Sequence, residues 1–415
     1  MSRDPLPVKK RLLLLMPATT YRAADFLAAA HRLGADVVVG SNLPQILEAF
    51  SEGGTITLDF DDPAAAVEQI RPLPPFDAII GVDEESVSLA AMLSAALKLP
   101  HNPVEAVAAT RNKAVARRIF REAGLPAPRF EVIGVEEDPE PAATRVGYPC
   151  VVKPLILAAS QGVIRADDAA SLRAAVTRVS AILAAPAVRK HGPASRQLLV
   201  EAFIPGREVA LEGLLRHGRL DVLALFDKPD PLDGPFFEET LYVTPSRLPR
   251  PIQDTIADCA ERAARALGLR DGPIHAELRV NQQGPWLLEV AARSIGGLCS
   301  RALRFGTGLT LEEIIIGHAL GMKIPSLERE RRAAGVMMIP IPNAGKLVAV
   351  RGREAARGLP GIEEVTILMR RGQRVVPLPE GSRYLGFIVA RGETPEQVEA
   401  ALRQAHKCLA IDINP

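Results

Sequence analysis

The sequence predicts an α/β protein of two or three packed units, the first of them built on an open parallel sheet. The chain has 415 residues, which exceeds one ordinary domain. Hydrophobic residues make up 47% and charged residues 24%, a composition typical of globular proteins. Short apolar runs alternate with helical patterns over the first hundred residues, and such alternation is typical of parallel strands joined by helices.

The first unit is expected to span residues 1–102. Its predicted strands lie at 11–16, 36–39 and 77–82, and its helices at 22–33 and 86–97. The apolar run of the first strand is too short for a membrane span or a signal-peptide core. No GxGxxG pattern follows that strand, so the fingerprint of a dinucleotide site is missing. Asn102-Pro103 marks the end of the unit.

The second unit is expected at residues 103–325 and the third at 326–415. A helix at 111–123 opens the second unit, with Thr110 as its N-cap and Gly124 just past its end. A strand-rich region follows to about residue 321, with helices at 169–183 and 252–267 and an exposed insertion at 184–196. After a charged helix or linker at 326–332, the third unit has predicted strands at 336–341, 365–368 and 385–390 and helices at 351–357 and 394–407.

Charge and cysteine content exclude several classes of function. Lys plus Arg (50) nearly cancels Asp plus Glu (49), which argues against nucleic-acid and membrane-surface binding. Aromatic residues, at 4%, are too few for a base-stacking platform. The four cysteines are scattered, so neither a zinc site nor a disulfide framework is expected. We therefore expect a cytoplasmic protein that acts on small molecules.

Two glutamates in a predicted hairpin are the strongest sign of chemistry. Residues 274–280 alternate apolar and polar side chains, and 286–290 form the return strand. A turn centred between them places Glu277 opposite Glu289, with Cβ atoms roughly 4.5–5.5 Å apart. Two opposed carboxylates repel unless a cation lies between them, and Mg²⁺ is the simplest such cation. The alternatives are an off-centre turn, or neutralisation of the pair by Arg279.

A basic residue followed by two glycines comes directly after this hairpin. The segment holds Arg293, Ser294, Gly296 and Gly297. A guanidinium matches phosphate oxygens bidentately, and a Gly-Gly turn lets backbone N–H groups approach a ligand. The segment is therefore a candidate oxyanion or phosphate site. A capping turn with a surface arginine is the alternative.

Weaker signals lie upstream. Lys153 ends an apolar strand, where burial of an ammonium group is costly unless an anion meets it. A small-residue loop containing Ser160 and Gly162 follows. Glu201 ends a second apolar strand, and Glu208 follows a Pro-Gly turn. Such carboxylates can bind an adenine edge and ribose hydroxyls, or they are ordinary exposed strand ends.

From residue 102 to about 321, the chain resembles the ATP-grasp superfamily in the order of these motifs and elements. The resemblance implies an ATP-grasp fold with a Rossmann-like pre-ATP-grasp domain before it and a C-terminal α/β subdomain after it. It implies ATP with two Mg²⁺ ions at Glu277 and Glu289, for which Mn²⁺ is an expected substitute. The loop at 160–163 is implied to close over the phosphates, and Arg293 to stabilise an acyl phosphate. The implied nucleotide-binding residues are Lys113, Lys153, Ser160, Gly162, Glu201, Ala202, Phe203, Ile204, Glu208 and Lys228.

Within that superfamily the chain resembles the L-amino acid ligase group. The runs that carry the likeness are 226–229, 235–240, 289–297 and 377–386. Ala291 and His275 depart from the D-alanine–D-alanine ligase pattern, which has Asn and Arg there, and they leave the shell of the second metal open. The group forms dipeptides, and a homodimer is common among such ligases.

The resemblance implies an ATP-dependent carboxylate–amine ligase that acts through an acyl phosphate and releases ADP and phosphate. Glu238 or Glu239 is expected to bind a substrate ammonium group. His275 is either the proton acceptor for the amine or a hydrogen-bonded structural histidine. Lys228 could instead pair with Asp227. The alternatives for the whole chain are an ATP-grasp carboxylase, a purine-pathway ligase or a non-catalytic ATP-binding regulator.

Overall fold

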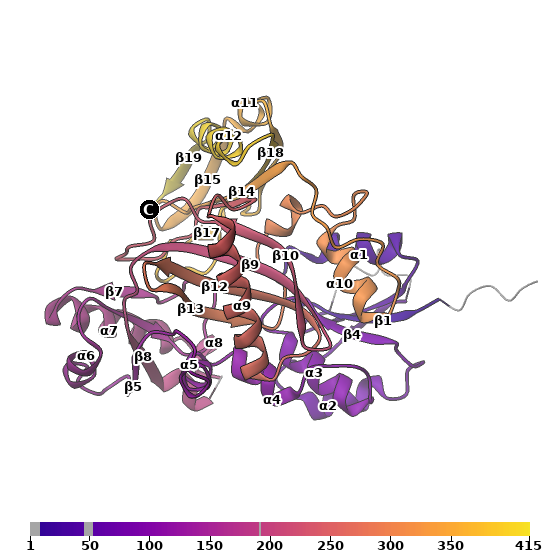
Figure 1. Cartoon of the computed structure of the whole chain (residues 1–415), viewed down its shortest axis with the longest axis horizontal. Helices are drawn as coiled ribbons and strands as arrows, with labels where there is room; N and C mark the ends of the chain where they lie inside the picture. Colours follow the sequence, from indigo (N-terminus) through magenta and orange to yellow (C-terminus); the bar gives the residue numbers. More distant parts are fainter. Residues whose placement is uncertain (1–8, 45–52, 191) are drawn as a thin grey trace, which may run out of the picture.

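The computed structural model describes residues 9–44, 53–190 and 192–415. They form four sheets, and the largest of these lies at the centre of the molecule (Figure 1). The N-terminal sheet lies beside one end of the central strands, and the helices α11 and α12 lie near the C-terminus (Figure 1). No helix in the described ranges is long and apolar enough to cross a bilayer.

The N-terminal unit is a parallel sheet with the order β3-β2-β1-β4, as the alternating pattern predicts. The leucines of β1 are fully buried, and alternate ones face opposite sides because side chains alternate along a strand. Leu12 and Leu14 pack toward α1, whereas Leu13 and Leu15 pack toward α2 and α3. The elements are β1 (Arg11–Leu15), α1 (Ala23–Arg32), β2 (Asp36–Ser41), β3 (Thr55–Thr57), α2 (Pro63–Ile70), β4 (Ala78–Gly81), α3 (Val87–Ala96) and α4 (Val104–Thr110).

The helix predicted at 111–123 begins later than expected, and its cap was assigned wrongly. Thr110 is the last residue of α4, where its hydroxyl donates to the Val107 carbonyl. Asn112 is the N-cap of α5 (Lys113–Glu122), because its side chain accepts from the backbone N–H groups of Ala114 and Val115. This cap places Lys113 at the first position of the helix.

The β5–β8 unit, residues 130–202, is an antiparallel sheet with the order β5-β8-β6-β7. Its elements are β5 (Phe130–Gly134), α6 (Glu140–Val146), β6 (Cys150–Pro154), β7 (Ile164–Ala166), α7 (Ala169–Leu183), α8 (Pro186–Arg189), η2 (Gly192–Arg196) and β8 (Gln197–Ala202). The insertion predicted at 184–196 is largely exposed and holds the short helices α8 and η2.

The central sheet has eight strands in the order β13-β12-β9-β10-β11-β14-β18-β16. It crosses the boundary expected at 325/326, because β11 pairs with β14. Helix α9 covers one face (Figure 1). The first elements are β9 (Arg207–Arg216), β10 (Arg219–Asp227), β11 (Leu241–Thr244), α9 (Arg250–Leu267), β12 (Gly272–Asn281), β13 (Gly284–Ala291), η3 (Cys299–Ala302) and α10 (Leu311–Ala319).

The C-terminal part combines an extension of the central sheet with a small sheet of its own, β17-β15-β19. Its elements are β14 (Ala333–Ile339), β15 (Gly345–Arg351), α11 (Arg353–Arg357), β16 (Ile362–Ile367), β17 (Arg374–Val375), β18 (Gly386–Gly392), α12 (Pro395–Lys407) and β19 (Ala410–Asn414). Helix α10 packs against α1, so the segment after the hairpin shares a core with the N-terminal unit (Figure 1).

Candidate active site

A cavity of about 280 Å³ lies between the N-terminal unit, the β5–β8 unit and the central sheet. It brings together most of the residues that the sequence analysis singled out. Those that line it are Lys113, Lys153, Ser160, Glu201, Ala202, Phe203, Ile204, Glu208, Glu239, His275, Glu277, Glu289, Arg293, Gly296 and Gly297. Gly162, Lys228, Glu238 and Ser294 are not among its lining residues.

The two glutamates of the hairpin lie opposite each other as predicted, although the turn and the strand register differ from those expected. Glu277 lies opposite Glu289, while the two-residue turn between Asn281 and Gly284 is offset from the expected centre. A bulge at Leu288 adds one residue to β13 and restores the pair. Both Leu288 and Glu289 line the cavity in consequence.

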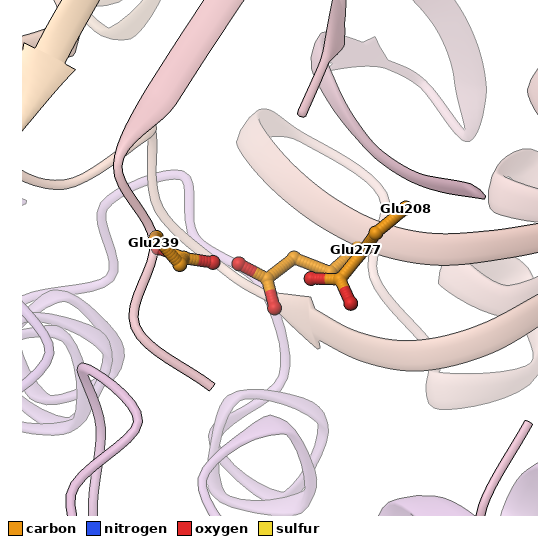
Figure 2. A group of neighbouring side chains, drawn as sticks. All are labelled: Glu208, Glu239 and Glu277. Carbon is orange, nitrogen blue, oxygen red and sulfur yellow. The ribbon is translucent and has the colours of Figure 1, made fainter. Parts of the chain in front are cut away.

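Three carboxylates gather around one ammonium group beside the hairpin. Figure 2 shows Glu208, Glu239 and Glu277 turned toward one another, and one oxygen from each lies within 4.8 Å of the others. Lys228 Nζ lies 2.8 Å from Glu208 and 3.2 Å from Glu277, and it also contacts Glu239 closely. Burial raises the pKa of Glu239 to about 7, against the opposing charge of Lys228. Lys228 therefore pairs with this cluster and not with Asp227, which binds Arg247.

His275 lies between two carboxylates. Its Nδ1 is 3.3 Å from Glu212 and its Nε2 is 3.5 Å from Glu277. Burial lowers the pKa of His275, but the hydrogen bonds to these carboxylates outweigh it and raise the pKa to about 9. A histidine that keeps its proton at neutral pH is poorly suited to accept one. Glu212, fully buried, also accepts from the Ile295 backbone N–H at 2.9 Å and so joins His275 to the turn after β13.

Both predicted phosphate lysines are buried in the cavity wall. Lys113 donates to the Leu157 carbonyl at 2.7 Å and lies 3.5 Å from Glu289. Lys153 pairs closely with Glu201, which Arg117 also binds at 2.9 Å. Burial alone would raise the pKa of Glu201, but Arg117 and Lys153 hold it below its ordinary value.

The linker predicted to bind adenine forms one wall. Its Phe203 N–H donates to the Pro149 carbonyl at 3.0 Å, and its Ile204 carbonyl accepts from Arg279 at 2.9 Å. The Phe203 ring also lies 4.9 Å from the Arg279 guanidinium. Arg279 binds Glu208 at 3.0 Å, so it does not neutralise the hairpin pair.

Arg293 lines the cavity, where it is held by a partner that the sequence did not reveal. Its Nε donates to Glu84, in the loop after β4, at 2.7 Å. Burial would lower the pKa of Arg293, but Glu84 raises it further above its ordinary value. Asp83, Glu84 and Glu85 all line the cavity. They follow a predicted strand directly, but only the folded chain brings them to Arg293.

The turn after Arg293 divides into structural and cavity-facing residues. The Ser294 hydroxyl accepts from the buried Arg22 at 2.7 Å and thus links the turn to the N-terminal unit. Gly296 and Gly297 line the cavity. Gly297 has φ +66°, and a Cβ there would lie 2.7 Å from the Phe387 ring, so any other residue would be strained at this position.

A less polar part of the cavity contains residues to which the sequence analysis gave no role in the site. Tyr21, Tyr242, Cys299, Met338 and Tyr384 line it. Among the described residues, the buried Tyr384 hydroxyl has no hydrogen-bond partner. Burial raises the pKa of Cys299 far above that of an ordinary thiol, which removes its nucleophilic form. Tyr384 alone belonged to a run that the sequence had marked.

Comparison with known proteins places the chain in a family. Residues 27–101 match the ATP-grasp N-terminal domain, 146–302 the ATP-grasp domain, and 337–414 the L-amino acid ligase C-terminal domain 2. The solved structure of an L-amino acid ligase from Bacillus licheniformis is 30% identical, with a TM-score of 0.83 over 98% of this chain and 99% of that one. The chain belongs to the L-amino acid ligase family.

Other comparisons give more distant relatives. The alanine–anticapsin ligase of Bacillus subtilis is 26% identical over 58% of this chain and 53% of its own length. The first curated relatives are longer, and the chain spans between 49% and 64% of their lengths. N5-carboxyaminoimidazole ribonucleotide synthetase from Thermotoga maritima is 16% identical, with a TM-score of 0.72 over 98% of this chain and 100% of that one. At that identity, it shares the ATP-grasp fold alone.

Proposed function

We propose that this chain is an ATP-dependent ligase that joins two amino acids by an amide bond, through an acyl phosphate, and releases ADP and phosphate. The observation that carries the proposal is the composition of one cavity. Lys113, Lys153 and Arg293 supply positive charge to the same space that the paired glutamates Glu277 and Glu289 enter. Such a set suits a triphosphate with its metal beside a second reactant.

The carboxylate arrangement fits a divalent cation. Glu277 and Glu289 oppose each other on neighbouring strands, and Glu277 also meets Glu208 and Glu239. Mg²⁺ prefers one or two carboxylates together with water and phosphate oxygens, so Glu277 and Glu289 would hold it. When bound, the ion would neutralise the charge of the phosphates.

The residues of the cavity divide the proposed chemistry between them. Lys113 and Lys153 bind and orient the phosphates, which fixes the γ-phosphorus in line with the attacking carboxylate of the first amino acid. The Phe203–Ile204 linker provides the wall for adenine. Arg293 and the backbone N–H groups of the Gly296-Gly297 turn stabilise the oxyanion that forms when the amine attacks the acyl carbon.

Recognition of the amine is proposed for Glu239. It lines the cavity, whereas Glu238 does not. Its ion pair with the ammonium group of Lys228 supports this role. The neighbouring wall of Tyr21, Tyr242 and Tyr384 would contact the side chains of the substrates.

Phosphate release tests the proposal most simply. The full chain is incubated with ATP and Mg²⁺ in pairwise mixtures of the twenty L-amino acids, and products are detected by mass. We expect phosphate together with a dipeptide mass in particular mixtures. Phosphate release that needs bicarbonate and no amino acid would favour a carboxylase instead. ATP binding without turnover in any mixture would contradict the proposal.

A further inference from the structure

The C-terminal segment 377–386 contacts a loop that forms one wall of the cavity. The loop spans residues 157–163, between β6 and β7. The Gly162 backbone N–H donates to the Pro379 carbonyl at 2.9 Å, and the Gln161 side-chain amide donates to the Glu380 carbonyl at 2.7 Å. Tyr384, from the same C-terminal segment, lines the cavity. One segment thus touches both the loop and the site.

An ion pair between α7 and the C-terminal segment adds to these contacts. Arg178 of α7 binds Glu380 through two nitrogens, with Nη2 2.9 Å from Oε2. The Arg178 guanidinium also lies 4.9 Å from the ring of Phe236. Phe236 belongs to the segment that carries Glu239, and it forms a β-bridge with Ile164, the first residue after the loop. Arg178 therefore contacts two segments that border the cavity.

The loop does not keep its shape by backbone preference alone. Ala159 and Ser160 both have φ +55°, a region that residues with a side chain rarely adopt. Within the loop, the bond from the Gln161 N–H to the Ala158 carbonyl is long, at 3.3 Å. Contacts from outside the loop must therefore stabilise this conformation. Lys113 provides one such contact at the Leu157 carbonyl, and Pro379 and Glu380 provide others at Gly162 and Gln161.

We propose that Arg178 and Glu380 are positioning residues that keep the 157–163 loop closed, and that they thereby decide whether the acyl phosphate reacts with the amine or with water. This inference rests on the proposed ligase function. Attack by the amine forms the C–N bond, breaks the bond between the acyl carbon and the phosphate oxygen, and passes the amine proton to phosphate. Attack by water breaks the same bond and regenerates the carboxylate. Both routes release phosphate, but only the first yields peptide.

Hydrogen exchange tests the positioning role without reference to catalysis. Exchange is measured on the full chain, with Mg²⁺ and the imido analogue of ATP, in peptides that cover residues 157–165. The ion pair is half exposed, at 44% and 41% of the two side chains, so Arg178→Gln or Glu380→Gln should speed exchange by up to about fivefold. The double variant Arg178→Glu with Glu380→Arg should restore the wild-type rate. Exchange unchanged in both single variants would overturn the proposal.

The same helix provides a matched control. Arg173 of α7 also pairs with a glutamate, Glu140, at 3.1 Å, but that pair lies within the β5–β8 unit. Arg173→Gln removes a comparable ion pair without touching the C-terminal segment, so exchange in the loop should stay at the wild-type rate. An equal acceleration in Arg173→Gln would overturn the proposal, because it would mean that any loss of charge on α7 loosens the loop.

The ratio of phosphate to peptide tests the choice between amine and water. We expect about one phosphate per peptide in the wild type and up to about fivefold more in Arg178→Gln and Glu380→Gln, with recovery in the double variant. Faster exchange with an unchanged ratio would overturn the claim about water. If the wild type makes no peptide from any amino acid pair, the proposed function fails, and the exchange rates alone decide whether the loop is held as described.

Discussion

Arg293 is oriented by a residue from a different unit of the chain. Its Nε binds Glu84 and its Nη1 binds the Ser294 carbonyl, at 2.7 and 3.0 Å. These two bonds fix the plane of the guanidinium, and Nη2 has no hydrogen-bond partner among the described residues. Arg111 lies 3.6 Å from the same carboxylate. Glu84 therefore positions the group that would stabilise the oxyanion.

Glu84→Gln should lower the rate of ligation more than it affects ATP binding. The neutral amide can accept a hydrogen bond from Nε but cannot form the ion pair, so Arg293 is held less firmly. We expect kcat to fall by about tenfold, a loss of roughly 1.4 kcal/mol of transition-state stabilisation, with an unchanged KM for ATP. Steady-state phosphate release checks both values. Glu68→Gln, which removes an exposed carboxylate from α2, is the control. A raised KM with normal kcat would assign Glu84 to nucleotide binding instead.

At the scale of single elements, the turn after β13 depends on two adjacent glycines that have different surroundings. A Cβ at Gly297 would lie 2.7 Å from the Phe387 ring at φ +66°, whereas one at Gly296 would meet no atom within 4 Å. Glycine is therefore favoured at 297 for two reasons: the backbone there is left-handed, and a side chain would contact Phe387 of β18. The sequence shows the pair but not this difference.

Gly297→Ala should destabilise the fold, and Gly296→Ala should not. The left-handed backbone costs about 1–2 kcal/mol for alanine, and the contact with Phe387 adds to it. We therefore expect the free energy of unfolding to fall by about 2 kcal/mol or more in Gly297→Ala. Urea denaturation of both variants measures the difference. Equal stability of the two would show that the Phe387 ring moves away and that strain at this turn is small.

Local sequence patterns predicted the helices and strands well where these depend on neighbouring residues in the chain. The alternation at 274–280 gave the strand and its partner, since inward and outward side chains repeat every second residue. The N-cap of α5 was missed because Thr110 and Asn112 are both good caps, and only the fold selects one. The bulge at Leu288 left no signal in the sequence, although it restores the Glu277–Glu289 pair.

At the scale of the whole molecule, the units do not separate as cleanly as the sequence suggested. The central sheet continues into the C-terminal part through β11 and β14, and α10 packs on the N-terminal unit. The partners of the site residues come from distant segments: Glu84 for Arg293, Glu212 for His275 and Pro379 for the loop. Such pairings depend on how the sheets meet, which no local pattern encodes.

Arg22 joins the N-terminal unit to the turn after β13. The side chain is only 1% exposed, donates to Val82 and Ser294, and lies 4.0 Å from the buried Glu312. Arg22→Met should lower the free energy of unfolding by about 3 kcal/mol, because it removes the ion-pair partner of the buried Glu312. Adding Glu312→Gln should recover part of that loss, which urea denaturation of the single and double variants can measure. A double variant no more stable than Arg22→Met would mean that Arg22 stabilises the fold through Val82 and Ser294 and not through Glu312.

The central claim is that a substrate carboxylate attacks ATP and is activated as an acyl phosphate. The most direct test uses an amino acid pair that gives a dipeptide, with the carboxylate of the first amino acid labelled with ¹⁸O. The account predicts one labelled oxygen in the released phosphate for each peptide formed, because that oxygen bridges carbon and phosphorus before the amine displaces it. Peptide formation with unlabelled phosphate would contradict it.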